Sequence, residues 1–231
     1  MKFIFLKTVA AASIALGAAQ AHAEWVSFPG SAHGGKTVNY SVTAGTATAS
    51  GFGYAGGFVT VLNGGPSFTS YCVDLFEYIN FGSSYSNYTL VDGSAHAFSN
   101  TRADADLGKL FALHPTITNE LNEAAFQIAV WELAYETSRS YDVSTGTAKF
   151  SGGTAASSGA LALANTWLAG LGSIKAGVDV DVLESIATRG TIGHQDVVFA
   201  APVPEPSTYA LMAAGLLSMG FVARRRSRSE V

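Results

Sequence analysis

The chain has little cysteine and little charge. Its 231 residues include one cysteine, Cys72, and only 13% of the residues are charged. A single thiol cannot form an internal disulfide, which leaves either a small buried apolar side chain or a reactive group. One cysteine with scattered histidines also lacks the paired spacing of a zinc site. The sequence therefore predicts no internal disulfide and no metal centre.

Basic residues are scarce in the central part of the chain. Between Glu24 and Val203 there are 7 basic and 15 acidic residues, a net charge of −8, although the whole chain carries −4. Nucleic-acid binding requires a basic face. The charge balance therefore argues against a nucleic-acid partner.

The first 23 residues have the pattern of a secretory signal peptide. Lys2 and Lys7 precede a short apolar run, and Ala-His-Ala ends at Ala23. A basic start, an apolar core and small residues before the cleavage point are typical of export signals. We expect signal peptidase to cleave after Ala23, so that the mature chain begins at Glu24.

The other end carries a second targeting pattern. Pro204-Glu205-Pro206 precedes an apolar stretch from Tyr209 to Ala223, and the basic residues Arg224, Arg225 and Arg226 follow. The stretch is marginal for a membrane-spanning helix, and its arginines would stay on the cytoplasmic side. Residues 204–231 resemble the PEP-CTERM sorting signal of Gram-negative bacteria. The resemblance implies a short transmembrane helix with transient inner-membrane anchoring, cleavage by an exosortase, and delivery to the cell surface or extracellular matrix.

Residues 24–203 have the length of one domain and change character along the chain. Short alternating runs at 36–42, 56–63 and 68–76 predict β-strands, and so do 177–185 and 193–200. Helical spacing at 102–114, 118–137 and 157–171 predicts three helices between them, with Thr118 as an N-cap. The pattern indicates an α+β fold: a strand-rich sandwich or barrel-like domain with a helical insert.

Cys72 lies in a predicted strand. Alternation places Tyr71 with the apolar residues of one face and Cys72 with Asp74 on the other, so Cys72 is expected to lie off the main core stripe. A catalytic thiol needs a base. None of the histidines of the mature chain has a recognisable cysteine-hydrolase context; they are His33, His96, His114 and His194.

Gln127 is the unusual residue of the second predicted helix. It lies within an apolar run from Ala124 to Val130, with Trp131 one turn later. A buried amide without partners costs about 1–3 kcal/mol. Gln127 is therefore expected to be either hydrogen-bonded or chemically changed.

Two short motifs together resemble the Cys-Gln thioester domain of bacterial surface adhesins. Tyr71-Cys72 matches the aromatic-Cys strand motif, and Gln127 with Ala129, Val130 and Trp131 matches the Gln-x-Ala-Ile/Val-Trp helix motif. Phe126 stands where the adhesins often have threonine. The resemblance implies an internal thioester between Cys72 and Gln127, formed with loss of ammonia and without a cofactor. Tyr71, Asp74 and Trp131 would form the supporting pocket, and Asp74 or Glu132 could assist proton movement.

Taken together, the two resemblances imply an exported surface or matrix protein that forms covalent links to targets bearing an accessible amine. Such a bond reacts once per molecule, so the protein would not be an enzyme. A non-covalent structural protein of the matrix or biofilm is the alternative. A cysteine hydrolase is a third, although no base is identifiable for it.

Overall fold

The computed structural model describes residues 23–187 and 193–201, together with residues 212, 215, 216 and 219. The predicted signal peptide therefore lies outside the described residues up to position 22, and so does nearly all of the predicted sorting signal. Within the described part of the chain, no helix is long and apolar enough to cross a membrane.

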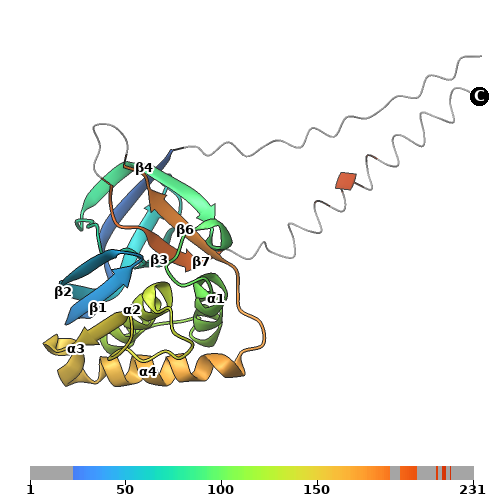
Figure 1. The fold of residues 1–231 in the computed structure, drawn as a ribbon. Coiled ribbons are helices and arrows are strands. Elements are labelled where there is room, and N and C mark those ends of the chain that lie inside the picture. Colours follow the sequence, from blue (N-terminus) through green and yellow to red (C-terminus); the bar gives the residue numbers. More distant parts are fainter. Residues whose placement is uncertain (1–22, 188–192, 202–211, 213–214, 217–218, 220–231) are drawn as a thin grey trace, which may run out of the picture.

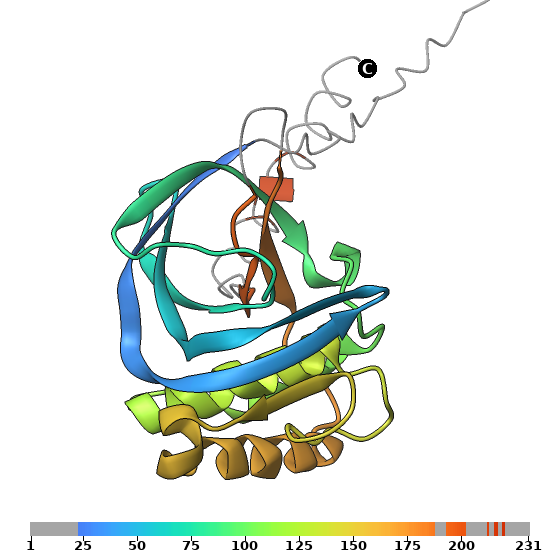
Figure 2. The same cartoon turned by 60° about the vertical axis from the view of Figure 1, so that its left-hand side comes forward.

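Six strands form a closed antiparallel barrel, which Figures 1 and 2 show from two sides. Strand β1 pairs with β2 on one side and β4 on the other, and β4–β6, β6–β7, β7–β3 and β3–β2 pairings complete the ring. Closure removes the exposed sheet edges that promote aggregation. The strands are β1 (Glu24–Ala44), β2 (Ala47–Leu62), β3 (Ser67–Cys72), β4 (Ser83–Asp92), β6 (Val180–Ser185) and β7 (Val197–Ala200).

The helices are inserted between β4 and β6 and cover one side of the barrel (Figures 1 and 2). A short strand, β5 (Ala148–Ser151), joins the far half of β1 within the same segment. This order of strands, helices and strands confirms the predicted α+β fold with a helical insert. The helices are α1 (Ala103–Leu113), α2 (Glu120–Tyr135), α3 (Gly153–Ser158) and α4 (Ala160–Gly170), with single 3-10 turns at Gly93–Ala95 and Leu171–Ser173.

Two predicted helix boundaries were wrong, each for a local reason. Helix α2 begins after Asn119, not Thr118, because the Asn119 side chain accepts the N–H of Asn122 at 2.9 Å. The helix predicted at 157–171 is divided into α3 and α4 at Gly159. Gly159 has a left-handed φ of +86°, which ends the first helix and begins the second.

Helix α2 lies at the centre of the molecule, between the barrel strands and α4. Every residue from Glu123 to Tyr135 is buried, as the apolar run predicts. Buried polar groups must therefore find partners in the surrounding strands and loops. Helix α2 carries four such residues: Glu123, Gln127, Glu132 and Glu136.

Glu132 and Glu136 hold the loop that follows α2. Glu132 accepts the backbone N–H of Asp142 at 2.8 Å, and its second oxygen has no hydrogen-bond partner among the residues that the structure describes. Glu136 accepts the N–H groups of Ser138 and Thr147. Burial raises the pKa of Glu132 to about 8, and the hydrogen bond from Asp142 opposes this only in part. Glu132 is therefore protonated in the folded protein at neutral pH.

Raising the pH from 5 to 8 should destabilise the wild type through Glu132. In this range the unfolded chain has released the Glu132 proton and the folded protein still holds it. Stability therefore falls by up to about 1.4 kcal/mol per pH unit. Glu132→Gln keeps the acceptor for Asp142 and removes this slope. Urea denaturation should show the variant more stable than wild type at pH 8 and closer to it at pH 5.

Glu120→Gln is the matched control for this experiment. Glu120 is on the same helix, but its side chain is half exposed and paired with Lys36. Its replacement should shift stability slightly and equally at both pH values. Parallel pH profiles for wild type and Glu132→Gln would contradict the assignment.

Candidate functional site

Gln127 and Cys72 are joined by a reciprocal pair of hydrogen bonds. The Cys72 backbone N–H donates to Gln127 Oε1 at 2.9 Å, and Gln127 Nε2 donates to the Cys72 carbonyl oxygen at 2.8 Å. Gln127 is fully buried and Cys72 is 1% exposed. The structure thus places these two residues in direct contact across 55 positions of sequence.

A local separation of β2 and β3 makes room for this pairing. Phe58 of β2 lies opposite Ser70 of β3, so a continued ladder would bring Gly56 opposite Cys72. The β2–β3 ladder ends at the Phe58–Ser70 pair, whereas Gly56 keeps its pairing with Gly35 on the other side of β2. The Cys72 N–H and carbonyl therefore lack a partner on β2, and the amide of Gln127 replaces it.

Glu123, one turn before Gln127, occupies the same gap. Its Oε2 accepts the Gly57 N–H at 3.1 Å, and its Oε1 contacts Nδ1 of His33 at 2.8 Å. Gly57 is required by this close approach, because a Cβ there would lie 2.5 Å from the Glu123 carboxylate. Glu123 thus fixes β2 in its separated position while Gln127 caps β3.

The same helix face continues toward the thiol. Trp131 is one turn after Gln127, and Tyr135 one turn further accepts the Leu75 N–H at 2.9 Å. The Trp131 indole N–H has no hydrogen bond of standard geometry among the described residues. It nevertheless lies close enough to the Cys72 sulfur to lower the pKa of the thiol, which favours the thiolate. One face of α2 therefore contacts the strand gap and the segment after β3 at four successive turns.

The Cys72 thiol is enclosed, and its predicted position off the core stripe was wrong. Ser70, Tyr71, Cys72 and Val73 are all buried, because the barrel covers one face of β3 and the helices cover the other. The Cys72 S–H donates to the Asp74 carbonyl at 2.9 Å. Burial raises the pKa of the Cys72 thiol well above its ordinary value, and the Trp131 N–H offsets only part of this.

Asp196 is a group near the thiol that sequence reasoning missed. It precedes β7, and its backbone carbonyl accepts the Val73 N–H at 2.9 Å. Burial raises the pKa of the Asp196 carboxyl to about 7, although its hydrogen bond from Ser185 opposes the shift. Only the pairing of β3 with β7 brings Asp196 beside Cys72, so the local sequence contained no signal for it.

The predicted supporting residues have different positions around the pair. Tyr71 faces the helices, where its ring centroid lies 4.4 Å from that of Phe126. Asp74 contributes its backbone carbonyl to the thiol, while its carboxylate accepts the Phe76 N–H at 2.7 Å. Glu132 is directed to Asp142 instead of Cys72. Asp74 is therefore the nearer of the two carboxylates considered for proton movement.

The described histidines make their contacts elsewhere. His33 contacts Glu123, and His96 contacts Glu184. The ring of His114 lies against Trp167, and that of His194 against Tyr85. None of these contacts involves Cys72. Within residues 23–187 and 193–201 no group of three or more His, Cys, Asp or Glu side chains is arranged to hold a metal ion.

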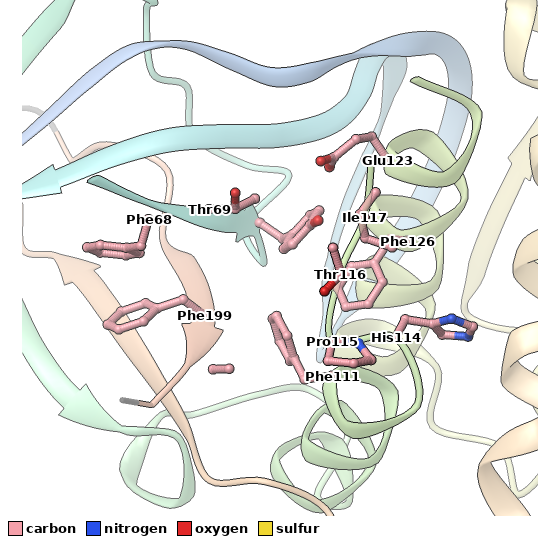
Figure 3. Close-up of a pocket in the computed structure, with 12 residues that line it drawn as sticks. Phe68, Thr69, Phe111, His114, Pro115, Thr116, Ile117, Glu123, Phe126 and Phe199 are labelled. Atoms are coloured by element: carbon pink, nitrogen blue, oxygen red, sulfur yellow. The ribbon is translucent and has the colours of Figure 1, made fainter. Parts of the chain in front are cut away.

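Two cavities lie next to the Cys72–Gln127 pair on its Tyr71 and Trp131 sides, and a third of about 180 Å³ is lined by Asp74 and Asp196. The larger, about 350 Å³, lies between β3, β7 and the helices; Figure 3 shows Phe68 and Thr69 on one side with Phe126 and Glu123 on the other. Tyr71 also lines it. The smaller, about 160 Å³, is lined by aromatic side chains and by Trp131 and Gln195. Gln195 Nε2 donates to the Asp74 carbonyl that also accepts the Cys72 S–H.

In comparison with known protein families, the C-terminal part of the chain matches a sorting motif. Residues 202–226 match the PEP-CTERM protein-sorting motif. The motif marks an exosortase-sorted, exported protein of the cell surface or extracellular space of Gram-negative bacteria. No curated protein and no solved structure matches the chain.

Gln127→Ala should destabilise the fold more than helix propensity alone predicts. It removes the partners of a buried N–H and a buried carbonyl and leaves a cavity. A loss of about 2–5 kcal/mol in the free energy of unfolding is expected. Asn122→Ala, near the start of the same helix, is the control and should cost under about 1 kcal/mol. Equal effects in urea denaturation would contradict a bridging role for the Gln127 amide.

Proposed function

We propose that this exported protein forms an internal thioester between Cys72 and Gln127 and uses it to attach covalently to amine-bearing targets. The observation that carries the proposal is the reciprocal hydrogen bonding of the Gln127 amide with the Cys72 backbone. It holds the side-chain carbonyl beside the residue that bears the thiol. Holding two reactants together in this way raises their effective concentration and so lowers the entropic part of the barrier.

Thioester formation needs a nucleophile, a polarised carbonyl and a leaving group. The Cys72 sulfur attacks Gln127 Cδ, the Cδ–Nε2 bond breaks, and the thiol proton leaves with the nitrogen as ammonia. The Cys72 N–H already donates to Oε1 at 2.9 Å, so it can stabilise the negative charge that develops on that oxygen. Asp196, whose charge acts on the Cys72 thiol, is suited to accept the thiol proton and pass it to the leaving nitrogen.

Reaction with a target amine follows the steps of thioester formation in the opposite direction. A neutral primary amine attacks the same Cδ, the C–S bond breaks, and one proton moves from nitrogen to sulfur. The products are an amide at residue 127 and a free Cys72 thiol. Both residues are buried, which limits attack by water. Each molecule reacts once, so the protein is consumed as a cross-linker and does not turn over.

Sorting to the surface fits this chemistry, because target amines are presented outside the cell. We include in the proposal a signal peptidase cleavage after Ala23, transient inner-membrane anchoring by residues 209–223, and exosortase processing at Pro204-Glu205-Pro206. The sorting motif over residues 202–226 supports the last step.

A non-covalent structural role in the extracellular matrix is the second candidate, and one observation favours it. The Gln127 amide uses its oxygen and one N–H in bonds to the Cys72 backbone. A buried glutamine with such partners needs no chemistry to explain its presence. In this case Cys72 would be an ordinary buried thiol.

Intact mass separates the two roles. The freshly purified wild type should be one ammonia lighter than its sequence, and methylamine should restore mass at residue 127 while releasing a thiol. Cys72→Ala should show neither change. Gln127→Glu, which retains the carbonyl oxygen but has no amide nitrogen to lose, is the matched control. A wild type with its full mass, an unmodified Gln127 and no methylamine adduct would remove the covalent proposal.

The pH dependence of thioester formation tests Asp196. Its carboxyl, with a pKa raised to about 7 by burial, accepts a proton only when ionised. Formation after refolding, followed by mass, should accelerate as the pH rises through about 7. Asp196→Asn should be slower above pH 7.

Asp74→Asn is the control for a purely electrostatic effect. The negative charges of Asp74 and Asp196 both raise the pKa of the Cys72 thiol. If charge alone mattered, each substitution would speed formation by favouring the thiolate. Faster formation in Asp196→Asn would therefore exclude Asp196 as the proton relay.

A further inference from the structure

The smaller cavity, here called the aromatic cavity, opens at the surface among exposed rings. Phe52 is 65% exposed, Tyr78 is 73% and Phe81 is 49%. These rings come from two parts of the chain, β2 and the segment between β3 and β4, and they line one cavity. Exposed aromatic side chains gathered at one opening are typical of a binding surface.

The inner end of the aromatic cavity reaches the candidate site. Trp131 lines it and also approaches the Cys72 thiol. Gln195 lines it and bonds to the Asp74 carbonyl, which accepts the Cys72 S–H. By contrast, Tyr71, which lines the larger cavity, faces the helices. The aromatic cavity thus adjoins contacts of the sulfur, as does a cavity lined by Asp74, Asp196 and His96, which has fewer aromatic side chains.

Its chemistry favours a cation. Glu77 is in the lining, no lining residue is basic, and Asp74 lies close enough to raise the pKa of the Glu77 carboxyl, although burial is the larger cause. Aromatic faces attract ammonium groups, and a carboxylate at the same site adds to this attraction. The excess of acidic residues between Glu24 and Val203 also attracts cations to the protein.

Its size favours a single side chain. A volume of about 160 Å³ lies below the range of about 300–1,000 Å³ usual for small-molecule sites. We propose that the aromatic cavity binds the protonated side chain of a lysine on a target protein. The step that follows binding rests on the proposed thioester: the ammonium would lose one proton to Glu77 before attacking Gln127 Cδ.

The test uses Cys72→Ala, which cannot form a thioester, so binding is measured apart from reaction. Lysine with both backbone termini capped is titrated while the NMR signal of the Trp131 indole N–H is followed. We expect a saturable shift with capped lysine and none at the same concentrations with capped norleucine, which has a similar apolar chain without the charge. Equal shifts with both, or no shift at Trp131 with capped lysine, would overturn the proposal.

Two substitutions in the same background locate the site. Glu77→Gln and Tyr78→Leu should each weaken capped-lysine binding about threefold to tenfold, as expected for the loss of one ionic or cation–π contact. Asp179→Asn and Trp25→Leu are the matched controls, since both residues are exposed and lie outside the cavity lining. Unchanged affinity in both cavity variants would overturn the proposal.

Failure of the binding proposal and failure of the thioester proposal are distinguishable. A wild type of full mass that is inert to methylamine, together with charge-dependent binding in Cys72→Ala, would leave a cation-binding surface without covalent chemistry. A wild type that lacks ammonia, without binding of capped lysine, would leave a thioester whose amine enters by another route.

Discussion

The candidate site depends on one constraint: a buried amide and a buried strand end must satisfy each other. The β2–β3 ladder ends before Cys72, so its backbone has no partner on β2, and Gln127 is surrounded in sequence by the apolar run from Ala124 to Val130. Each would cost about 1–3 kcal/mol if left unpaired. Their two hydrogen bonds remove both penalties and fix the helix against the barrel. The helix cannot slide by one residue without losing them.

Glu123 makes this arrangement possible by holding the strands apart. Its carboxyl group accepts the Gly57 N–H on β2 and contacts His33 on β1, so the gap is maintained by polar contacts as well as by packing. Trp131 and Tyr135 extend the same helix face to the segment after β3. Because Glu123, Gln127 and Trp131 are spaced four residues apart, they lie on one face of α2, and the helix sets their positions together.

The sequence predicted the order of strands and helices well, because alternation and helical spacing are local signals. It also predicted that Gln127 needs a partner, because polarity within an apolar helix is visible without a structure. It did not reveal that both faces of β3 are covered, since the barrel closes through pairing between distant strands. Asp196 was missed for the same reason: it reaches Cys72 only through the β3–β7 ladder. Contacts across a closed sheet have no local signature.

The hydrogen bonds that stabilise the unreacted pair also affect what a thioester would do. Loss of ammonia removes the N–H that donates to the Cys72 carbonyl, so the thioester would leave that buried carbonyl unpaired. An attacking primary amine restores an N–H at this position and can renew the bond. Attack by water would leave a carboxylate, which has no donor to offer and would face the carbonyl oxygen. If the thioester forms, the backbone of Cys72 would therefore favour aminolysis over hydrolysis at Gln127, which is the selectivity that a covalent surface linker requires.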